Sequence, residues 1–527
     1  MRPHDMGTLF DEAAAGGART VVHLDRPFDI APRAGTRWTV PELAGLVRAT
    51  AARLADAGVG PGDRVAIVKD NHWDYDLLAC AAVRLGAVPA LLSARLDTAN
   101  LVTLLERLRP AALVTTAAVL ARCRDTAAGE PARIVLTVDS AAPGAAHLAA
   151  LDASRPCVPV RRHDDEPLVI HHTSGTTGVP KLVVHSTRTL VHKLARFEAV
   201  RYPGIGIRPD DVLANASAYG HGRTFCWTAV VVSLAPAGIL ILTGNDPEAA
   251  DPLLRAHPPS VVEALPASYI RLRPLTTRLD NPFRHVRLYI STYDAVHPPA
   301  LRAYLTASRR TRPLWMQGWG QTETGPLTFR FHTRRSALAP DAATTARRLG
   351  RPVPGRTRLR AVDPDTLRPV PRGHPGLLLV RTPALALGYI GEQDRWDAKR
   401  VGDWWSTGDM GVHHRDGSVS ILDRAADTLP GMSCLWTEDV LEQRLPQVLE
   451  CVILGAPDGV PLPVVVTADG RLDPDAWKQA THGLPALQDP AVLTWDAVPR
   501  TGTGKVRRST LARQLTGIAP AGTGRWT

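Results

Sequence analysis

A short loop rich in Gly, Ser and Thr carries the strongest chemical signal in the sequence. It is the run Thr173–Lys181 (TSGTTGVPK), which combines hydroxyl side chains, two glycines and one ammonium group. Glycines let the backbone turn tightly so that its N–H groups approach an anion, hydroxyls donate hydrogen bonds, and Lys181 adds positive charge. Apolar runs on both sides, Pro167–Ile170 and Leu182–Val184, are typical of strands. We therefore predict a phosphate-binding loop between two strands of one sheet.

Four further motifs follow this loop along the chain. They are Trp319–Gly325 (WGQTETG), Ser406–Asp409 (STGD), Asp423–Arg424 (DR) and Pro499–Lys505 (PRTGTGK). With the loop, and in this order, they resemble the motifs of the adenylate-forming superfamily, which comprises acyl-CoA synthetases, nonribosomal-peptide adenylation domains and beetle luciferases. The resemblance spans nearly the whole chain and implies an ATP-dependent, acid-activating ligase that uses Mg²⁺. The loop is not a Walker A motif, because Pro180 precedes its lysine and Leu182 follows it.

The resemblance assigns the catalytic chemistry. Adenylation displaces pyrophosphate from the α-phosphate of ATP, so the enzyme must neutralise charge on the triphosphate and place a nucleophile in line. By resemblance, Lys505 bridges the attacking oxygen and the α-phosphate, Thr322 binds the α-phosphate, and Glu323 is the Mg²⁺ ligand. His221 completes the predicted catalytic set.

A larger group of residues is predicted, by the same resemblance, to bind ATP. Trp319 packs on the adenine, Asp409 and Arg424 bind the ribose, and the phosphate loop embraces the β- and γ-phosphates. Of 62 basic residues only six are lysines, and two of these, Lys181 and Lys505, stand in motifs where an ammonium group would meet phosphate. The full predicted set is Thr173, Ser174, Gly175, Thr176, Thr177, Gly178, Lys181, Tyr293, Asp294, Trp319, Asp409 and Arg424.

The substrate pocket departs from the family pattern. Where the family has a Gly-Gly-Ala segment, this chain has Ser291–Ala295, and the ring of Tyr293 is expected to narrow the cavity. His221 and Arg223 are predicted to hold an anionic substrate. His172 replaces the usual Tyr before the phosphate loop. The predicted substrate-pocket residues are Tyr219, His221, Arg223, Tyr293, Gln317 and Gly318.

The hinge between domains also departs from the family. This chain has Ala426 where Asp or Lys is common, and Gly431 is the one candidate for the glycine that lines the pantetheine tunnel of CoA ligases. Adenylation is therefore better supported than thioester formation. CoA as a further cofactor, and CoA or an acyl-carrier protein as a partner, stay open.

Composition predicts a soluble protein with more than one core. The chain has 527 residues, 44% of them hydrophobic and 21% charged, and single cores stop growing near roughly 250–300 residues. Six scattered cysteines without C-x-x-C spacing argue against disulfides and zinc and fit a reducing cytoplasm. The net charge of +11 comes from arginines spread along the chain, so neither a nucleic-acid partner nor a membrane partner is predicted. The oligomeric state is left open.

Alternating strand and helix patterns predict the fold. They indicate an α/β protein with a large N-terminal domain, residues 1–423, and a small mobile α+β C-terminal lid domain, residues 424–527, which carries Lys505. The large domain should contain two doubly wound parallel-sheet subdomains and a small antiparallel β-subdomain near residues 326–422. The apolar stretch Trp227–Leu242, broken by Ser, Pro and Gly, is predicted to be helix, turn and strand.

Three functions are compatible with these observations. The leading one is activation of a small or aromatic carboxylate as its acyl-adenylate, followed by transfer to CoA, a carrier thiol or an amine. The second is a diazotase, in which nitrite attacks ATP and an aryl amine is diazotised. The third is a non-catalytic nucleotide-binding relative, which the presence of both Glu323 and Lys505 disfavours.

Overall fold

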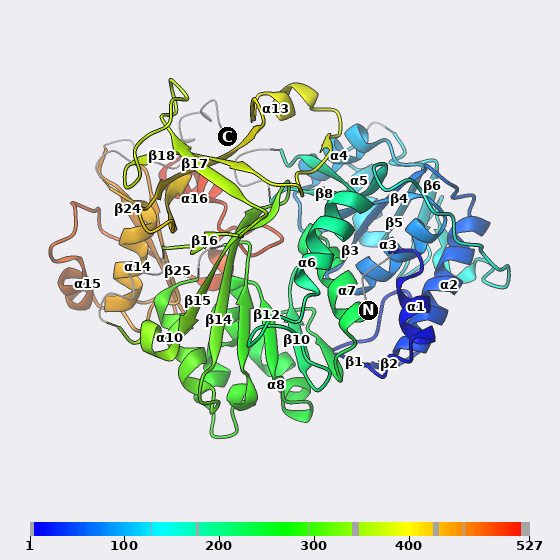
Figure 1. The fold of residues 1–527 in the computed structure, drawn as a ribbon, viewed down its shortest axis with the longest axis horizontal. Helices are drawn as coiled ribbons and strands as arrows, with labels where there is room; N and C mark the ends of the chain where they lie inside the picture. Colours follow the sequence, from blue (N-terminus) through cyan, green and yellow to red (C-terminus); the bar gives the residue numbers. More distant parts are fainter. Residues whose placement is uncertain are drawn as a thin grey trace.

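The computed structural model describes residues 5–127, 129–174, 179–294, 296–339, 347–424, 432–456 and 459–517, with Asp423 and Arg424 described by their backbone alone. Two large sheets lie side by side, with a small antiparallel sheet and a C-terminal α+β unit beside them (Figure 1). In the described ranges no helix has both the length and the apolar character needed to cross a bilayer.

The first large sheet has the strand order β19-β9-β8-β4-β3-β5-β6-β7. Strands β8 to β7 of this order run parallel, and β9 pairs antiparallel with β8, so the phosphate loop joins two neighbouring strands as predicted. Its strands are β3 (Arg64–Lys69), β4 (Val88–Ser93), β5 (Ala112–Thr115), β6 (Ile134–Thr137), β7 (Ala146–His147), β8 (Pro167–His172), β9 (Leu182–Ser186) and β19 (Gly388–Tyr389).

The second large sheet has the order β16-β15-β14-β13-β12-β10-β11-β1-β2, in which the strands from β14 to β1 are parallel. The two predicted parallel-sheet subdomains are thus confirmed. The strands are β1 (Val21–Leu24), β2 (Arg37–Thr39), β10 (Val212–Ala216), β11 (Gly238–Ile241), β12 (Val261–Ala264), β13 (Leu288–Ser291), β14 (Leu314–Gln321), β15 (Gly325–Thr333) and β16 (Arg351–Pro352).

Helix α7 (Gly222–Leu234) lies between the two large sheets (Figure 1). Every residue from Thr224 to Leu234 is buried, as expected of a helix that is apolar on all sides. Ala235 ends it in the left-handed conformation (φ 48°), and β11 follows, which confirms the predicted helix, turn and strand. The first two residues of α7, Gly222 and Arg223, line the cavity between the sheets.

The remaining helices cover the sheets. A π-helix, η2 (Thr187–Ala195), is continued by the short helix α6 (Arg196–Glu198). The others are α1 (Leu9–Ala15), α2 (Val40–Asp56), α3 (Asp74–Arg84), α4 (Thr98–Leu108), α5 (Ala117–Arg124), α8 (Pro247–Ala256), α9 (Pro266–Leu272), α10 (Pro298–Ala307), α11 (Arg334–Ala337), α13 (Gln393–Asp397), and the short 3₁₀ turns η1 (Leu148–Ala150), η3 (Arg273–Thr277) and η4 (Pro282–His285).

The predicted β-subdomain is smaller than residues 326–422. Strands β15 and β16 extend the second large sheet, and β19 joins the first, because their backbone groups pair with distant strands. The small antiparallel sheet consists of β17 (Arg358–Val362), β18 (Pro375–Arg381), β20 (Arg400–Val401), β21 (Trp404–His413) and β22 (Val419–Arg424).

The C-terminal unit is an α+β fold. Its three strands, β23 (Glu450–Leu454), β24 (Leu462–Thr467) and β25 (Ala491–Thr494), pack with α14 (Cys434–Arg444), α15 (Pro474–Thr481), η5 (Trp495–Ala497) and α16 (Arg508–Thr516). The domain boundary between residues 423 and 424 stays a prediction, and Ala426 and Gly431 lie outside the described residues.

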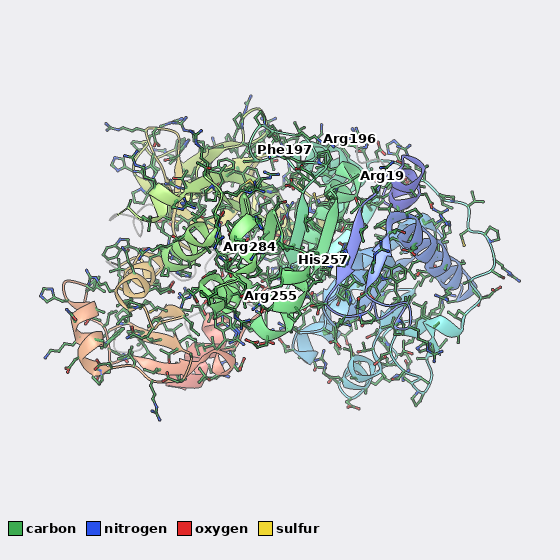
Figure 2. The ribbon with its side chains drawn as sticks, turned by 90° about the horizontal axis from the view of Figure 1, so that it is seen from below. Arg19, Arg196, Phe197, Arg255, His257 and Arg284 are labelled. Atoms are coloured by element: carbon green, nitrogen blue, oxygen red, sulfur yellow. The ribbon has the colours of Figure 1, made fainter. Side chains whose placement is uncertain are left out.

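Arginines are spread over the molecule. In the view of Figure 2, the labelled Arg19, Arg196, Arg255 and Arg284 come from four separate segments. Several are used in local ion pairs, such as Arg255 with Asp251 at 2.8 Å.

A buried ionic cluster joins the C-terminal unit to the rest of the protein. Arg347 donates to both carboxylate oxygens of Asp439 on α14, at 2.6 and 2.8 Å. His297, just before α10, contacts Asp439 at 3.0 Å and Glu442 at 3.1 Å. Burial alone would lower the pKa of His297, but Glu442 and Asp439 raise it to about 10. His297 is therefore a cation at neutral pH and holds α14 in place together with Arg347.

We expect this contact to weaken as pH rises. A histidine whose folded pKa is raised contributes stability that is complete below pH 6.5 and is lost as pH passes through about 10. Wild type should unfold about 2–4 °C above His297→Asn at pH 7, and within about 1 °C of it at pH 10. Thermal unfolding at both pH values measures the difference. His163→Asn, at a side chain that is 71% exposed, is the matched control; a pH-independent difference for His297→Asn would contradict the assignment.

Candidate active site

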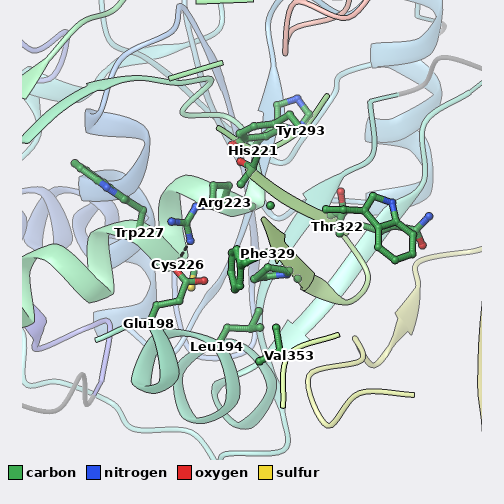
Figure 3. A pocket seen from close by; sticks show the side chains of 18 of the residues that line it. Leu194, Glu198, His221, Arg223, Cys226, Trp227, Tyr293, Thr322, Phe329 and Val353 are labelled. Atoms are coloured by element: carbon green, nitrogen blue, oxygen red, sulfur yellow. Dashed lines mark hydrogen bonds and ion pairs between the residues drawn. The ribbon is translucent and has the colours of Figure 1, made fainter. Parts of the chain in front are cut away.

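The predicted motifs meet around a cavity of about 520 Å³ between the two large sheets and the C-terminal unit. Its walls come from the phosphate loop, the turn after β14, the N-terminus of α7 and the lysine loop. Figure 3 shows the part of the wall that contains Arg223 and Thr322. Side chains at the carboxyl ends of parallel strands, as after β8 and β13, commonly form such sites in α/β proteins. The predicted site residues that line it are Thr173, Ser174, Lys181, His221, Arg223, Tyr293, Gly318, Trp319, Thr322, Glu323 and Lys505.

The two ends of the phosphate loop are held together by hydrogen bonds. The Thr173 N–H donates to the Lys181 carbonyl at 3.0 Å, and the Lys181 N–H donates to the Thr173 hydroxyl, also at 3.0 Å. The Lys181 ammonium lies 5.7 Å from the centre of the Tyr389 ring. Gly175, Thr176, Thr177 and Gly178 lie outside the described residues, so their predicted phosphate contacts stay predictions.

The turn that carries Thr322 and Glu323 is fastened to the first large sheet. The His185 Nε2–H donates to the Thr322 carbonyl at 2.7 Å, and the Ala386 N–H donates to the Glu323 carbonyl at 2.7 Å. The Tyr389 hydroxyl donates to Glu323 Oε1 at 2.6 Å. Burial lowers the pKa of His185 and raises that of Tyr389, so both are neutral donors at physiological pH. These two positioning residues were not predicted from the sequence.

A metal ion at Glu323 would depend on the nucleotide for most of its ligands. Among the described residues, no group of three or more His, Cys, Asp or Glu side chains forms a metal site. Mg²⁺ is commonly bound by one or two carboxylates together with phosphate oxygens and water. The buried, hydrogen-bonded carboxylate of Glu323 fits this pattern, and Mg²⁺ there would neutralise phosphate charge.

The predicted adenine and ribose residues lie together. Trp319 Nε1–H donates to Asp409 Oδ2 at 3.2 Å, which places the indole beside the carboxylate. Asp409 is buried on β21 and lies behind the cavity wall, and Arg424 is its register partner on β22. The side chain of Arg424 is outside the described structure, so its ribose contact stays a prediction. Asp294 follows Tyr293 and is exposed.

The lysine loop docks on the large domain through glycines. A Cβ at Gly502 would come within 2.5 Å of the Ser93 hydroxyl, and one at Gly504 (φ 80°) within 2.5 Å of the Ala267 Cβ. Inside the loop, the Thr501 N–H donates to the Lys505 carbonyl at 2.8 Å. A side chain at either position would force its neighbour to shift, so the two glycines favour this approach, which brings Lys505 into the cavity wall.

His221 occupies the point where the lysine loop and the substrate cavity meet. Burial, followed by the nearby His172, lowers its pKa well below 6.5, so its ring is neutral. Its Nε2 has no hydrogen-bond partner among the residues that the structure describes. His172 itself lies behind the wall: its Nε2 accepts from the Ser93 N–H at 3.1 Å, and its Nδ1–H donates to the Thr173 carbonyl at 2.7 Å.

Tyr293 lines the cavity with a strained backbone. Its φ is +77°, in the left-handed region that favours glycine and that a tyrosine rarely adopts. Its ring stands edge-on to His221 with centroids 6.1 Å apart, and its buried hydroxyl has no partner in the described part of the chain. Such strain of roughly 1–3 kcal/mol is retained where surrounding contacts enforce it, commonly at functional sites.

Three predicted substrate-pocket residues need correction. Arg223 lines the cavity but is already paired, with Glu263 at 2.7 Å and with Glu198, so its charge is not available to a substrate anion. Tyr219 is fully buried in the core and donates its hydroxyl hydrogen to the Asn215 carbonyl. Gln317 faces away from the cavity toward His332, because Met316 and Gly318 occupy the cavity face of β14.

Comparison with known proteins agrees with this arrangement. The model of the AMP-binding enzyme family matches residues 10–390. The chain belongs to the adenylate-forming, AMP-binding enzyme family. It is therefore an ATP-dependent adenylate-forming enzyme.

Two relatives and one solved structure illustrate the range of the family. The chain is 38% identical to the 3-amino-2-hydroxy-4-methoxybenzoate diazotase of Streptomyces cremeus, over 97% of this chain and 96% of the relative. It is 28% identical to the 3-aminoavenalumate diazotase of a Streptomyces species, over 89% and 87%. A benzoate CoA ligase from Burkholderia xenovorans has the same fold, with a TM-score of 0.76, 20% identity and coverage of 96% and 99%.

We expect Lys505→Ala to lose about 10²–10³-fold or more in turnover, with ATP affinity little changed, because the ammonium group acts on charge that develops in the transition state. Pyrophosphate release and nucleotide binding measure the two effects separately. Lys478→Ala, at an exposed lysine of α15, is the matched control. Near-normal pyrophosphate release by Lys505→Ala would contradict the catalytic role assigned to Lys505.

Arg223→Ala should destabilise the fold by about 3–5 kcal/mol, because it leaves two carboxylates without their buried partner. Adding Glu198→Gln and Glu263→Gln should recover part of the loss, since no unpaired charge then remains. Thermal unfolding measures both, with Arg309→Ala at an exposed position as control. Equal stability of wild type and Arg223→Ala would show that the ion pairs contribute little.

Proposed function

We propose that the protein is an ATP-dependent diazotase, which activates nitrite with ATP and diazotises an aryl amine. The observation that carries the proposal is the pairing of Arg223 by Glu198 and Glu263. A free cation at this position would suit an anionic substituent of a substrate, but here Arg223 is paired with both glutamates among mainly apolar neighbours. The pocket is thus suited to an aromatic ring with donor groups, and the two diazotase relatives support the same conclusion.

The proposed reaction has three steps. A nitrite oxygen attacks the α-phosphorus of ATP, the bond to the β-phosphate oxygen breaks, and pyrophosphate leaves. The amine nitrogen of the substrate then attacks the nitrosyl nitrogen, AMP leaves with the oxygen, and one N–H proton is released. Protonation and loss of water from the N-nitroso product give the aryl diazonium ion. Lys505 and Thr322 would stabilise charge on the α-phosphate in the first step, and Glu323 would hold Mg²⁺.

The cavity wall is consistent with an aromatic amine. Phe329, Trp227, Ile290 and Met316 provide apolar surface, and the unpartnered polar atoms of His221 and Tyr293 lie beside it. Both residues are neutral, so they can orient an amine by hydrogen bonding without repelling it. The proposed reaction needs no CoA. The altered hinge sequence at Ala426 fits an enzyme that forms no thioester.

The test is a pyrophosphate-release assay at pH 7.5 with ATP, Mg²⁺ and nitrite, with and without a panel of aminophenols and aminobenzoates. Diazonium product is trapped as an azo dye with a naphthol. We expect pyrophosphate release that requires nitrite, and dye formation that requires ATP, nitrite and an amine together. Reactions without ATP control for spontaneous diazotisation.

A parallel arm tests the carboxylate alternative. Aromatic and short-chain acids are supplied without nitrite, with hydroxylamine or CoA as acceptor. Hydroxamate or thioester formation from a carboxylate, together with no nitrite-dependent pyrophosphate release, would refute the diazotase in favour of an acid–thiol ligase.

A further inference from the structure

Three charged side chains from three elements meet in the substrate end of the cavity wall. Arg223 on α7 donates from Nε to Glu263 Oε1 on β12 at 2.7 Å and from Nη2 to Glu263 Oε2 at 3.2 Å. Its Nη1 donates to Glu198 Oε2 on α6. The exposed fractions of the side chains are 17% for Arg223, 13% for Glu198 and 6% for Glu263. We name this cluster the Glu–Arg–Glu triad.

The triad carries more negative than positive charge. Two carboxylates share one guanidinium, and the surrounding wall is mainly apolar, with Phe197 and Trp227 among the lining residues. Arg356, stacked 4.3 Å from the centre of the Phe197 ring, attracts Glu198 at longer range but forms no ion pair with it in the described structure. A substrate anion at this point would add to the net negative charge, whereas a hydrogen-bond donor would stabilise the carboxylates.

One oxygen of the triad lacks a hydrogen bond. Glu198 Oε1 is buried and has no partner among the described residues. A buried, unpaired carboxylate oxygen is costly, and such groups commonly receive a hydrogen bond from a ligand or from water. Arg223 donates three hydrogen bonds to the two glutamates, from Nε, Nη1 and Nη2, and none of them goes to Glu198 Oε1.

The triad lies away from the reacting groups. In Figure 3, His221 and Tyr293 lie at one side of Arg223, and Glu198 lies beyond it on the other. A ring whose reacting group is near His221 and Lys505 would therefore present its opposite edge to Glu198. We infer that the Glu–Arg–Glu triad is a specificity site for an N–H or O–H group on that distal edge of an aromatic substrate. From the proposed function, the inference takes only that the substrate contains an aromatic ring.

The experiment compares ligands that differ in one donor. Isothermal titration with AMP present and nitrite absent gives the affinity of 3- and 4-aminophenol and of 3- and 4-fluoroaniline, since fluorine is close to hydroxyl in size but donates no hydrogen bond. Wild type should bind the aminophenol at least about 10-fold more tightly than the matching fluoroaniline at one of the two ring positions. Glu198→Gln or Glu263→Gln should reduce this ratio to less than about 3-fold.

Controls separate this inference from folding and from the proposed function. Glu248→Gln, at a surface glutamate paired with Arg278, should keep the wild-type ratio. If Glu198→Gln unfolds, Glu263→Gln and the wild-type ligand comparison still decide the matter. A wild-type ratio near one at both ring positions, or a ratio that survives in both glutamine variants, would overturn the triad. Because no nitrite is used, a failed diazotisation assay with a preserved ratio would refute the diazotase and retain the triad.

Discussion

The active site depends on the bonds that fasten the turn after β14 to the first large sheet. His185, Ala386 and Tyr389 belong to segments of that sheet, whereas Thr322 and Glu323 belong to a turn of the second sheet. Three hydrogen bonds of 2.6–2.7 Å cross between the sheets within two residues of the turn. They fix Thr322 and Glu323 relative to β8 and β9, the strands on either side of the predicted phosphate loop. Without these hydrogen bonds, the turn after β14 would not be held in a fixed position relative to the first large sheet.

The same bonds explain why Tyr389 is placed where it is. Its hydroxyl holds Glu323, and the face of its ring meets the Lys181 ammonium at 5.7 Å. One aromatic side chain thereby contacts both Lys181, the predicted phosphate-binding cation, at the face of its ring and Glu323, the proposed metal ligand, at its hydroxyl. A hydrogen bond to a charged group is worth about 1.5–3 kcal/mol, which exceeds the roughly 0.5–1 kcal/mol of an exposed cation–π contact. The bond to Glu323 is therefore the stronger constraint on the ring.

Much of the nucleotide site could be predicted from the sequence, because its motifs are short and local. Thr173 and Lys181 need only a two-stranded turn, and Trp319 and Glu323 lie in one segment. The partners of Arg223 could not be predicted in this way: Glu198 precedes it by 25 residues and Glu263 follows it by 40, on elements with no shared periodicity. Gln317 was an avoidable error, since side chains alternate along a strand and Gly318 already occupied the cavity face. His185 and Tyr389 carried no motif, and only the pairing of β9 with β19 brings them near the turn.

Tyr293 has a backbone conformation that is unusual for a tyrosine. Its positive φ is the conformation that a glycine would adopt at no cost, and the surrounding contacts hold the tyrosine there. A buried hydroxyl without a described partner adds a second cost, which a bound substrate would remove by hydrogen bonding. Polar atoms without a partner among the described residues thus lie at both ends of the cavity: those of Tyr293 and His221 near the lysine loop, and that of Glu198 at the triad. An aromatic ligand with a hydrogen-bond donor at each end would supply the missing hydrogen bonds at both ends of the cavity. The free energy gained by pairing these buried polar atoms would then favour binding of that ligand.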